Sequence, residues 1–497
     1  MDKKMIYIVV AVVAVVAIAA AAFVVMGNQG GGDQPTQDGD KNKAAFTKQW
    51  TETNYKDGSV LWPARLLILG NADLDDKIDQ NDINVINSLI KNGYNYVDDF
   101  MADANYDGII DQKDIDMVQK LIDYNNYNGV VNYFDCDFKI ASYDMSHPVK
   151  TSNILTQTLE MLCILVPESV VAVDDRCASS AVVGANPQGG YWREYASVLD
   201  YSSLGSVGSH KAPSVERYLE VARVYGDGYL TAVMNASDTY NTYYMEEGLK
   251  GTNVQIIRCP SWERAGVDNG MLLLGYLFHK FDLATEWVAW HDGYYDDIMN
   301  KVSKLTESQK KKVVVGVLGD TDVAIADDIE LNYTTSAEWQ GIKRMGIIDV
   351  GGDYLKKHST SGSGYGSWSE HITKESMINL ITEAGGLDFF IGTIPGPFNV
   401  GPLESGKPTP TTYMESITGF LSDYSPDTAL QVIGWEWTSG PMDLVYYATV
   451  GKILYGWDYD IKTIVNEGLQ WIGNYGNDAD KCLWNYDNVK EYVLYPN

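Results

Sequence analysis

Two acidic stretches, residues 71–82 and 103–114, repeat one arrangement of oxygen-bearing side chains. Each carries Asp or Asn at positions 1, 3, 5, 9 and 12 and an isoleucine at position 8. A calcium ion needs six or more oxygen ligands, which a loop with this spacing can gather. A lone acidic loop is most often a solvated turn, but two copies, each followed by an apolar helical segment, predict two calcium sites. The predicted side-chain ligands are Asn71, Asp73, Asp75, Asp79 and Asp82 in the first loop and Asp103, Asn105, Asp107, Asp111 and Asp114 in the second.

Position 12 of each loop is aspartate rather than glutamate, and a single helical segment follows each loop. In both respects residues 61–128 resemble a dockerin domain rather than a paired-helix EF-hand. The resemblance implies that Lys77 and Ile109, at position 7, add backbone carbonyls to the two calcium sites. Asp76 stands where that family usually has glycine, and we expect it to carry some left-handed backbone strain without removing a ligand.

Dockerins attach enzymes to scaffold proteins, and their loop positions 10 and 11 read the partner. Here these positions hold Gln80 with Asn81 and Gln112 with Lys113, rather than the small hydroxyl pair of the best-known members. The resemblance therefore leaves open what this module contacts: a cohesin-like protein, another part of this chain, or a surface layer.

The composition excludes several classes of function. A formal net charge of -30 excludes a nucleic-acid partner, because the chain cannot neutralise a run of phosphates. The 5 cysteines form no CxxC pair, and at least one should be a free thiol because the count is odd. The 6 histidines form no HxH or HExxH pair, which argues against a zinc hydrolase. Neither a GxSxG nucleophile elbow nor a Walker phosphate-binding loop occurs, which argues against the enzymes that use them.

The N-terminal segment, Met5 to Met26, is an uninterrupted apolar run that follows two lysines. It is long enough to cross a bilayer, and the lysines favour an inside N-terminus. We expect residues 1–26 to be a single-pass anchor in the cell membrane, with a cleaved signal peptide as the alternative. Residues 27–60 read as a polar linker, and the later domains then face outside the cell. The glycosylation triplets at Asn235 and Asn332 are compatible with that location.

Beyond residue 130, short apolar strands alternate with helical patterns, which predicts an α/β fold with parallel sheets. Ligands of such sheets bind at the carboxyl ends of the strands. The expected strands are 170–173, 229–233, 254–257, 313–318, 346–350, 389–392 and 431–434, and the expected helices include 215–224, 271–278, 374–383 and 444–454.

One longer helix is predicted between the two halves of this region. Apolar residues recur at steps of three and four from Leu283 to Leu305, and a strand follows at 313–318. The helix could be the backbone between two lobes or an ordinary crossover within one sheet. Gly293, near its middle, would allow it a small flexure.

Several ordered landmarks resemble substrate-binding proteins of the iron-siderophore, haem and cobalamin class. They are 139–144 (KIASYD), the turn 204–216 (LGSVGSHKAPSVE), the strand 229–235, 258–262 (RCPSW) and 372–375 (ITKE). The resemblance covers residues 137–497 and implies two Rossmann-like lobes, 137–282 and 307–497, joined by a single long helix at 283–306. The landmarks on both sides of that helix favour its role between the lobes.

In the resembled class no bond is made or broken, so the chain is not expected to be an enzyme. The loaded protein docks on an ABC permease in the membrane through one glutamate of each lobe. Glu216 and Glu375 match these two positions. A glutamate at a helix start also stabilises the helix dipole, which is the alternative explanation for both.

Aromatic and cationic side chains follow several of the predicted strands, where a ligand would lie. Arginine can hold an anionic chelate, and Trp or Tyr can face a macrocycle. The expected cargo is a small-molecule metal chelate, either a ferric siderophore or a related haem or cobalamin, rather than a free ion. The candidate ligand-binding residues are Trp192, Arg193, Ser209, His210, Arg258, Trp262, Tyr365, Trp368 and Trp435.

Two other functions remain open from the sequence. Dockerins commonly accompany polysaccharide hydrolases, and Glu436 lies between two tryptophans, so a dockerin-bearing carbohydrate-active enzyme is one alternative. A cell-surface structural protein stabilised by calcium is the other, and it would bind no small ligand.

Overall fold

The structure is a computed structural model that describes residues 63–136, 139–175, 177, 199–200, 203–209, 212–235, 242–261, 264–317, 329–332, 336–358, 369–394, 410–434 and 439–473. The expected membrane anchor and polar linker lie outside these residues and stay predictions. Within the described ranges, no helix has both the length and the apolar character needed to cross a membrane.

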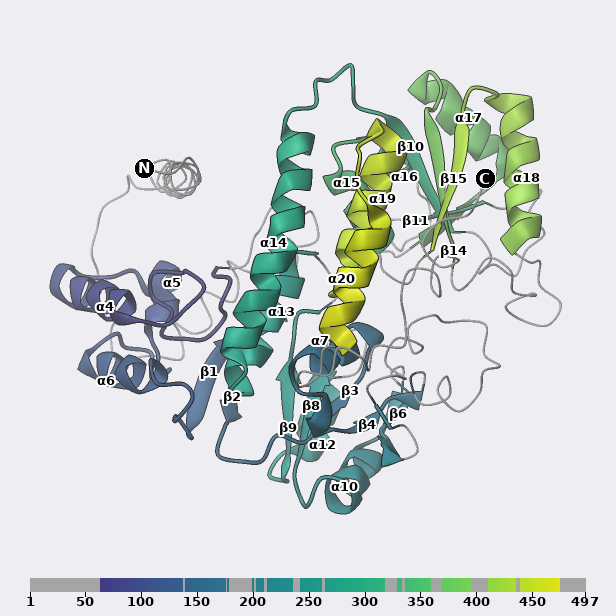
Figure 1. The fold of residues 1–497 in the computed structure, drawn as a ribbon. Coiled ribbons are helices and arrows are strands. Elements are labelled where there is room, and N and C mark those ends of the chain that lie inside the picture. Colours follow the sequence, from purple (N-terminus) through teal and green to yellow (C-terminus); the bar gives the residue numbers. More distant parts are fainter. Residues whose placement is uncertain are drawn as a thin grey trace.

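Residues 63–128 form a small helical module around the two acidic loops (Figure 1). A helix follows each loop, as predicted, and a short third helix lies between them. Asp79 and Asp111 cap the two main helices by accepting from the backbone N–H groups of Asn81 and Lys113. The helices are α4 (Gln80–Asn92), α5 (Tyr96–Asp99) with the 3-10 turn η1 (Phe100–Ala102), and α6 (Gln112–Leu121).

The N-lobe is built on a parallel sheet of order β5-β4-β3-β8-β9. The strands are β3 (Thr151–Asn153), β4 (Val170–Val173), β5 (Gly205–Ser206), β8 (Leu230–Met234) and β9 (Val254–Arg258). A hairpin, β1 (Val130–Phe134) with β2 (Ile140–Asp144), precedes the sheet, and β6 (Gly208–Ser209) pairs with β7 (Ala212–Pro213). The helical elements are α7 (Thr156–Leu165), η2 (Pro167–Ser169), α10 (Val215–Val224), α12 (Thr242–Leu249) and α13 (Arg264–Leu277). The strand order reverses at β3, so the topological switch point lies between β3 and β8.

The C-lobe sheet has the order β13-β11-β10-β14-β15, and β12 also pairs with β10. The strands are β10 (Lys312–Val317), β11 (Ile329–Asn332), β12 (Ile348–Asp349), β13 (Ser369–Ile372), β14 (Phe389–Ile394) and β15 (Ala429–Gly434). The expectation of parallel pairing is wrong for β11, which runs antiparallel to β10 and β13. Only the four residues IELN form β11, too few for an alternating pattern to be read. The C-lobe helices are α15 (Ala337–Arg344), α16 (Val350–His358), α17 (Lys374–Ala384), α18 (Pro410–Tyr424), α19 (Asp443–Tyr455) and α20 (Ile461–Gly473).

Helix α14 (Phe281–Ser303) carries the chain from the N-lobe to the C-lobe, as predicted. Its 23 residues span ~34 Å at ~1.5 Å per residue. It does not join the lobes alone, because α20 lies beside it (Figure 1), with Trp290 of α14 against Trp471 of α20. One buried cluster includes Val118 of the small module, Trp287 of α14 and Leu469 of α20. The predicted single helix is therefore one part of a packed helical layer.

The described cysteines form no disulfide with one another. They are Cys136, Cys163, Cys177 and Cys259.

Candidate functional site

The first acidic loop holds one buried oxygen without a donor. Asn71, at position 1, is fully buried, and its Nδ2 donates to the carbonyl oxygens of Leu66 at 2.8 Å and Asp75 at 2.6 Å. Its Oδ1 finds no hydrogen-bond donor among the described residues. A bound cation would supply the missing partner, so Asn71 fits the predicted calcium site.

The position-12 carboxylates of both loops are also fully buried. Asp82 accepts from the N–H groups of Ala72 and Asp79, each at 2.7 Å, and Asp114 accepts from its own loop in the same way. Burial raises the pKa of the Asp82 and Asp114 carboxyl groups to about 7. A dication beside them would remove this penalty, because the charge of a bound ion dominates its surroundings.

The second loop closes around Asp103. This buried carboxylate accepts from the N–H groups of Asp107 at 3.1 Å and Gly108 at 2.8 Å, and from the hydroxyl of Tyr96 at 2.5 Å. Burial raises the pKa of Asp103. The all-oxygen donor set of both loops suits a hard cation such as calcium. All twelve predicted ligand residues lie in the two loops, and calcium binding itself stays a prediction.

The two loops follow different backbone paths at position 6. At position 4, Leu74 and Tyr106 both have left-handed φ values, of 64° and 58°. At position 6, Gly108 has φ 89°, whereas Asp76 has no positive φ. The expected left-handed strain at Asp76 is therefore wrong. Its carboxylate instead lies 3.1 Å from Nε of Arg65, outside the loop.

The carboxyl ends of the two large sheets meet at the junction of the lobes. Gln157 follows β3 in the first turn of α7, and Ser439 lies between β15 and α19. Nε2 of Gln157 donates to Oγ of Ser439 at 3.0 Å, and both residues are buried. The two edges that bind ligands in α/β proteins therefore face each other.

Buried polar groups line the N-lobe side of this junction. Nδ2 of Asn153, at the end of β3, donates to Oδ2 of Asp174 at 3.0 Å, just beyond β4. Its Oδ1 is buried without a donor in the described part of the chain. Nδ2 of Asn235, after β8, donates to Oγ of Ser261 at 3.1 Å. The sequence analysis missed these residues because it looked for aromatic and cationic groups, although a polar residue directly after a strand could have indicated them.

Of the nine candidate ligand-binding residues, the structure describes Ser209 and Arg258. Ser209 lies half-buried in β6. Arg258, the last residue of β9, is buried, and its guanidinium bonds Glu246 through Nε at 2.6 Å and lies 3.8 Å from Asp135. An anionic ligand would have to compete with these carboxylates for Arg258. Trp192, Arg193, His210, Trp262, Tyr365, Trp368 and Trp435 lie outside the described residues.

Glu216 and Glu375 occupy the same position in the two lobes. Each is exposed, and each stands two residues after the hydroxyl N-cap of its helix, Ser214 for α10 and Thr373 for α17. The pKa of Glu216 is lowered by hydrogen bonds from its own N–H group and from the Ser214 hydroxyl. Both helices lead into a parallel strand, β8 or β14, so their first turns lie towards the carboxyl edge of the sheet.

The asparagines of the two glycosylation triplets are buried in the folded protein. Asn235 is 6% exposed and Asn332 is 1% exposed. Their amide nitrogens lie inside the lobes, because each asparagine ends or follows a buried strand. Because both asparagines are buried, the triplets add nothing to the expected outside location.

No model of a known protein family matches this sequence, and no curated protein matches it either. Among solved structures, it is similar to an ABC transporter solute-binding protein from Sulfurospirillum deleyianum, with 12% identity, a TM-score of 0.48, and 73% of this chain and 98% of that chain covered. It is similar to a TroA-like periplasmic binding protein from Veillonella parvula at 12% identity and a TM-score of 0.49, covering 68% and 95%. A periplasmic haem-binding protein of Vibrio cholerae matches at 13% identity and a TM-score of 0.41, covering 62% and 99%. Likenesses of this size do not establish a family.

Proposed function

We propose that this chain is an extracytoplasmic substrate-binding protein of an ABC importer that carries a calcium-binding module. The observation that carries the proposal is the hydrogen bond between Gln157 and Ser439, 3.0 Å long, across the junction of the lobes. It puts the carboxyl edges of two α/β sheets against each other, and ligands of α/β sheets bind outside those edges at a switch point. A ligand held there would contact both lobes at once.

The polar residues at the junction support binding of a polar small molecule. Asn153 lies at the switch point of the N-lobe sheet and has a buried carbonyl oxygen that no described donor satisfies. Asn235 and Ser261 lie beyond the neighbouring strands β8 and β9. Together these groups can donate and accept hydrogen bonds without charge. The proposed cargo is an iron chelate, namely a ferric siderophore, or a related haem or cobalamin, completed by the predicted aromatic residues.

The two exposed glutamates support delivery to a membrane permease. Glu216 and Glu375 have equivalent positions in the two lobes, and both lie towards the carboxyl edge of their sheet. A permease with two subunits can therefore meet one carboxylate from each lobe. The proposed partners are this permease and the small-molecule chelate.

The two acidic loops support binding of two calcium ions in residues 63–128. The orphaned Oδ1 of Asn71 and the buried carboxylates of Asp82 and Asp114 are the groups that an ion would satisfy. The ions would lie within the loops and take no part in the chemistry of the cargo. At loop positions 10 and 11, which read the partner in dockerins, the side chains are exposed and could contact a further partner. These residues are Gln80, Asn81, Gln112 and Lys113.

A thermal-unfolding screen of the full chain tests the proposed cargo. Ferric siderophores, haem and cobalamin are added separately, with calcium held in excess throughout. Binding to the native state alone raises the free energy of unfolding by about 2.7 kcal/mol when the ligand is at about 100 times Kd. A shift with one of these ligands is expected. No shift with any of them would contradict transport and favour a structural protein, and sugar hydrolysis would favour the dockerin-bearing enzyme.

A further inference from the structure

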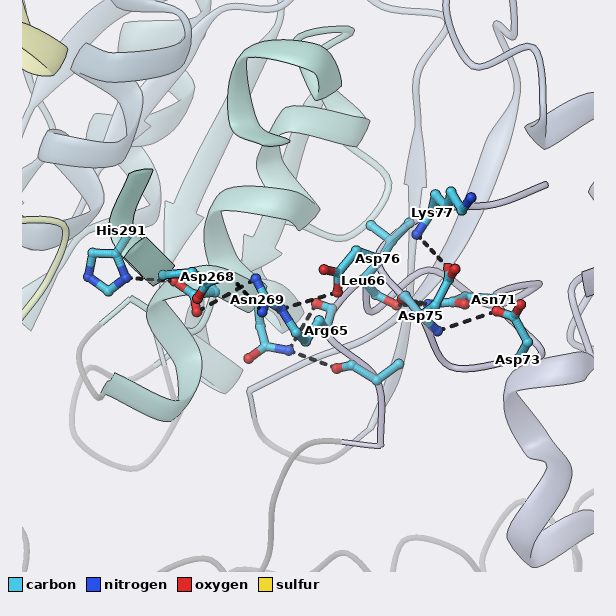
Figure 2. A network of polar contacts seen from close by, with 12 residues as sticks. Arg65, Leu66, Asn71, Asp73, Asp75, Asp76, Lys77, Asp268, Asn269 and His291 are labelled. Carbon is cyan, nitrogen blue, oxygen red and sulfur yellow. Dashed lines mark hydrogen bonds and ion pairs between the residues drawn. The ribbon is translucent and has the colours of Figure 1, made fainter. Parts of the chain in front are cut away.

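Arg65 connects the first acidic loop to the helices at the junction of the lobes (Figure 2). Its Nε lies 3.1 Å from Oδ1 of Asp76, at position 6 of the loop. Its Nη1 donates to Oδ2 of Asp292 in α14 at 2.9 Å, and its Nη2 lies 3.9 Å from Oδ2 of Asp268 in α13. One guanidinium therefore lies within ion-pair distance of carboxylates from three separate elements.

The backbone around Arg65 is held by asparagine side chains from α13 and from the first loop. Nδ2 of Asn269, in α13, donates to the carbonyl oxygens of Ala64 at 2.7 Å and Arg65 at 2.9 Å. On the other side, Nδ2 of Asn71 donates to the carbonyl oxygen of Leu66 at 2.8 Å. Asn71 is position 1 of the loop and a predicted calcium ligand. The segment 64–66 thus lies between a calcium ligand and α13.

The contacts continue from Asp268 into the C-lobe. Oδ1 of Asp268 lies 3.1 Å from Nδ1 of His291, and Nε2 of His291 lies 2.8 Å from Oδ1 of Asp443. His291 belongs to α14 and Asp443 to the first turn of α19, and both are buried. A continuous series of polar contacts therefore runs from the first loop through α13 and α14 to α19.

The second loop is connected differently: Nδ2 of Asn132, in β1, donates to the carbonyl oxygen of Ala104 at 3.1 Å. Its position 6 is Gly108, which has no carboxylate to offer. Lys113, beside it, pairs within the loop with Asp107 at 2.8 Å. Asp76, in the first loop, thus replaces the glycine of the repeat and reaches out of the loop to Arg65. This difference assigns the two loops different roles.

We propose that the calcium ion of the first loop acts within this chain, by fixing the helical layer between the two lobes through Asp76 and Arg65. The inference rests on the calcium part of the proposed function. Asp76 lies between two predicted ligands, the Asp75 side chain and the Lys77 carbonyl, so the ion sets its position. Without the ion, the oxygen ligands of the loop repel one another and the loop opens. Arg65 then loses Asp76, and its hold on Asp268 and Asp292 weakens. Asp76 and Arg65 are positioning residues, since neither contacts the ion through its side chain.

Hydrogen exchange of the full chain, with and without calcium, tests this inference. Calcium is expected to slow amide exchange in the first loop and also in α14 and α19, by about tenfold, within the usual range of coupling between sites. The Asp76→Gly variant restores the glycine of the second loop and keeps every predicted ligand. It should bind two calcium ions, as measured by calorimetry, but lose the slowing in α14 and α19.

Two further variants complete the test. Arg65→Met should lose the same distant protection, while Arg223→Met, which removes an exposed arginine paired only with Glu220 in the described contacts, should retain it. Equal protection of α14 and α19 in the wild-type protein and in Asp76→Gly, with two ions bound to each, would overturn this inference and leave the proposed function standing. If calorimetry detects no calcium binding to the wild-type chain, the calcium part of the proposed function fails as well. If Arg65→Met does not fold, the comparison of hydrogen exchange between the wild-type protein and Asp76→Gly still tests the inference.

Discussion

His291 Nε2 lies 2.8 Å from Asp443 Oδ1, which joins the helix between the lobes to the first turn of α19. The other ring nitrogen of His291 faces Asp268 of α13 at 3.1 Å, and the histidine side chain is fully buried. Of the two contacts, the one from Nε2 has hydrogen-bond geometry, and Nδ1 lies at ion-pair distance from Asp268. This one side chain therefore holds three helices together in a place where water cannot replace it.

Replacing His291 by leucine should strongly destabilise the protein. The change leaves Asp268 and Asp443 buried without the imidazole, and breaking a buried pair in this way costs about 3–5 kcal/mol. Urea unfolding at constant calcium concentration measures the loss. The matched control is His358→Leu, since His358 pairs with Glu383 on the surface at 3.1 Å. Surface pairs contribute about 0–1 kcal/mol, so equal losses in the two variants would refute the role of His291.

Replacing Gly293 by alanine should stabilise the protein by about 1 kcal/mol. Alanine favours the helix over glycine by this amount, and a Cβ at Gly293 would meet no atom within 4 Å. The predicted flexure at this residue adds a second expectation, because a stiffer α14 should change ligand affinity while stability rises. Chemical unfolding and ligand titration of the same variant separate the two effects. An unchanged ligand affinity would mean that flexure of α14 at Gly293 plays no part in ligand binding.

The parts of the fold that could be predicted from the sequence depend on local patterns. Helix α14 was predictable because its apolar residues recur at helical steps, and the acidic loops because the same spacing occurs twice. The site contacts join residues far apart in the chain, and no local pattern signals them. Gln157 and Ser439 are 282 positions apart, and Arg65 and Asp292 are 227 positions apart.

The role of Asp76 shows the same limit. From the loop alone, a residue at the glycine position reads as a source of strain. The structure relieves it by a different backbone path, and a distant arginine gives the carboxylate a partner. Only the packing of the small module against α13 and α14 brings that arginine into reach.

In the absence of calcium, the protein should lose stability as the pH rises from about 4 to about 7. Burial raises the pKa of Asp82 and Asp114 from the ordinary value of 3.8 to about 7 in the folded chain. The folded state then holds protons that the unfolded chain releases, so their contribution is complete below pH 3.8 and is lost as the pH passes through about 7. Urea unfolding in a chelator at several pH values measures the slope. Asp114→Asn should reduce it, and excess calcium should abolish it near pH 7, since the ion replaces the protons. A stability that rises with pH in the chelator would contradict the buried state of these carboxylates.

Reversing the charge of both Glu216 and Glu375 should reduce uptake without changing ligand binding. Both side chains are exposed and lie at equivalent positions of α10 and α17, so their loss leaves the packing of the lobes intact. A charge reversal at a docking surface replaces attraction by repulsion, and we expect uptake to fall by about tenfold or more, equivalent to ~1.4 kcal/mol. Transport into cells or permease-containing vesicles is compared with ligand affinity measured on the isolated protein. The matched control reverses Glu220 of α10 and Glu383 of α17, which lie on the same helices away from their first turns. If the control variant and the Glu216 and Glu375 variant transport equally well, these two glutamates act only on their helix dipoles.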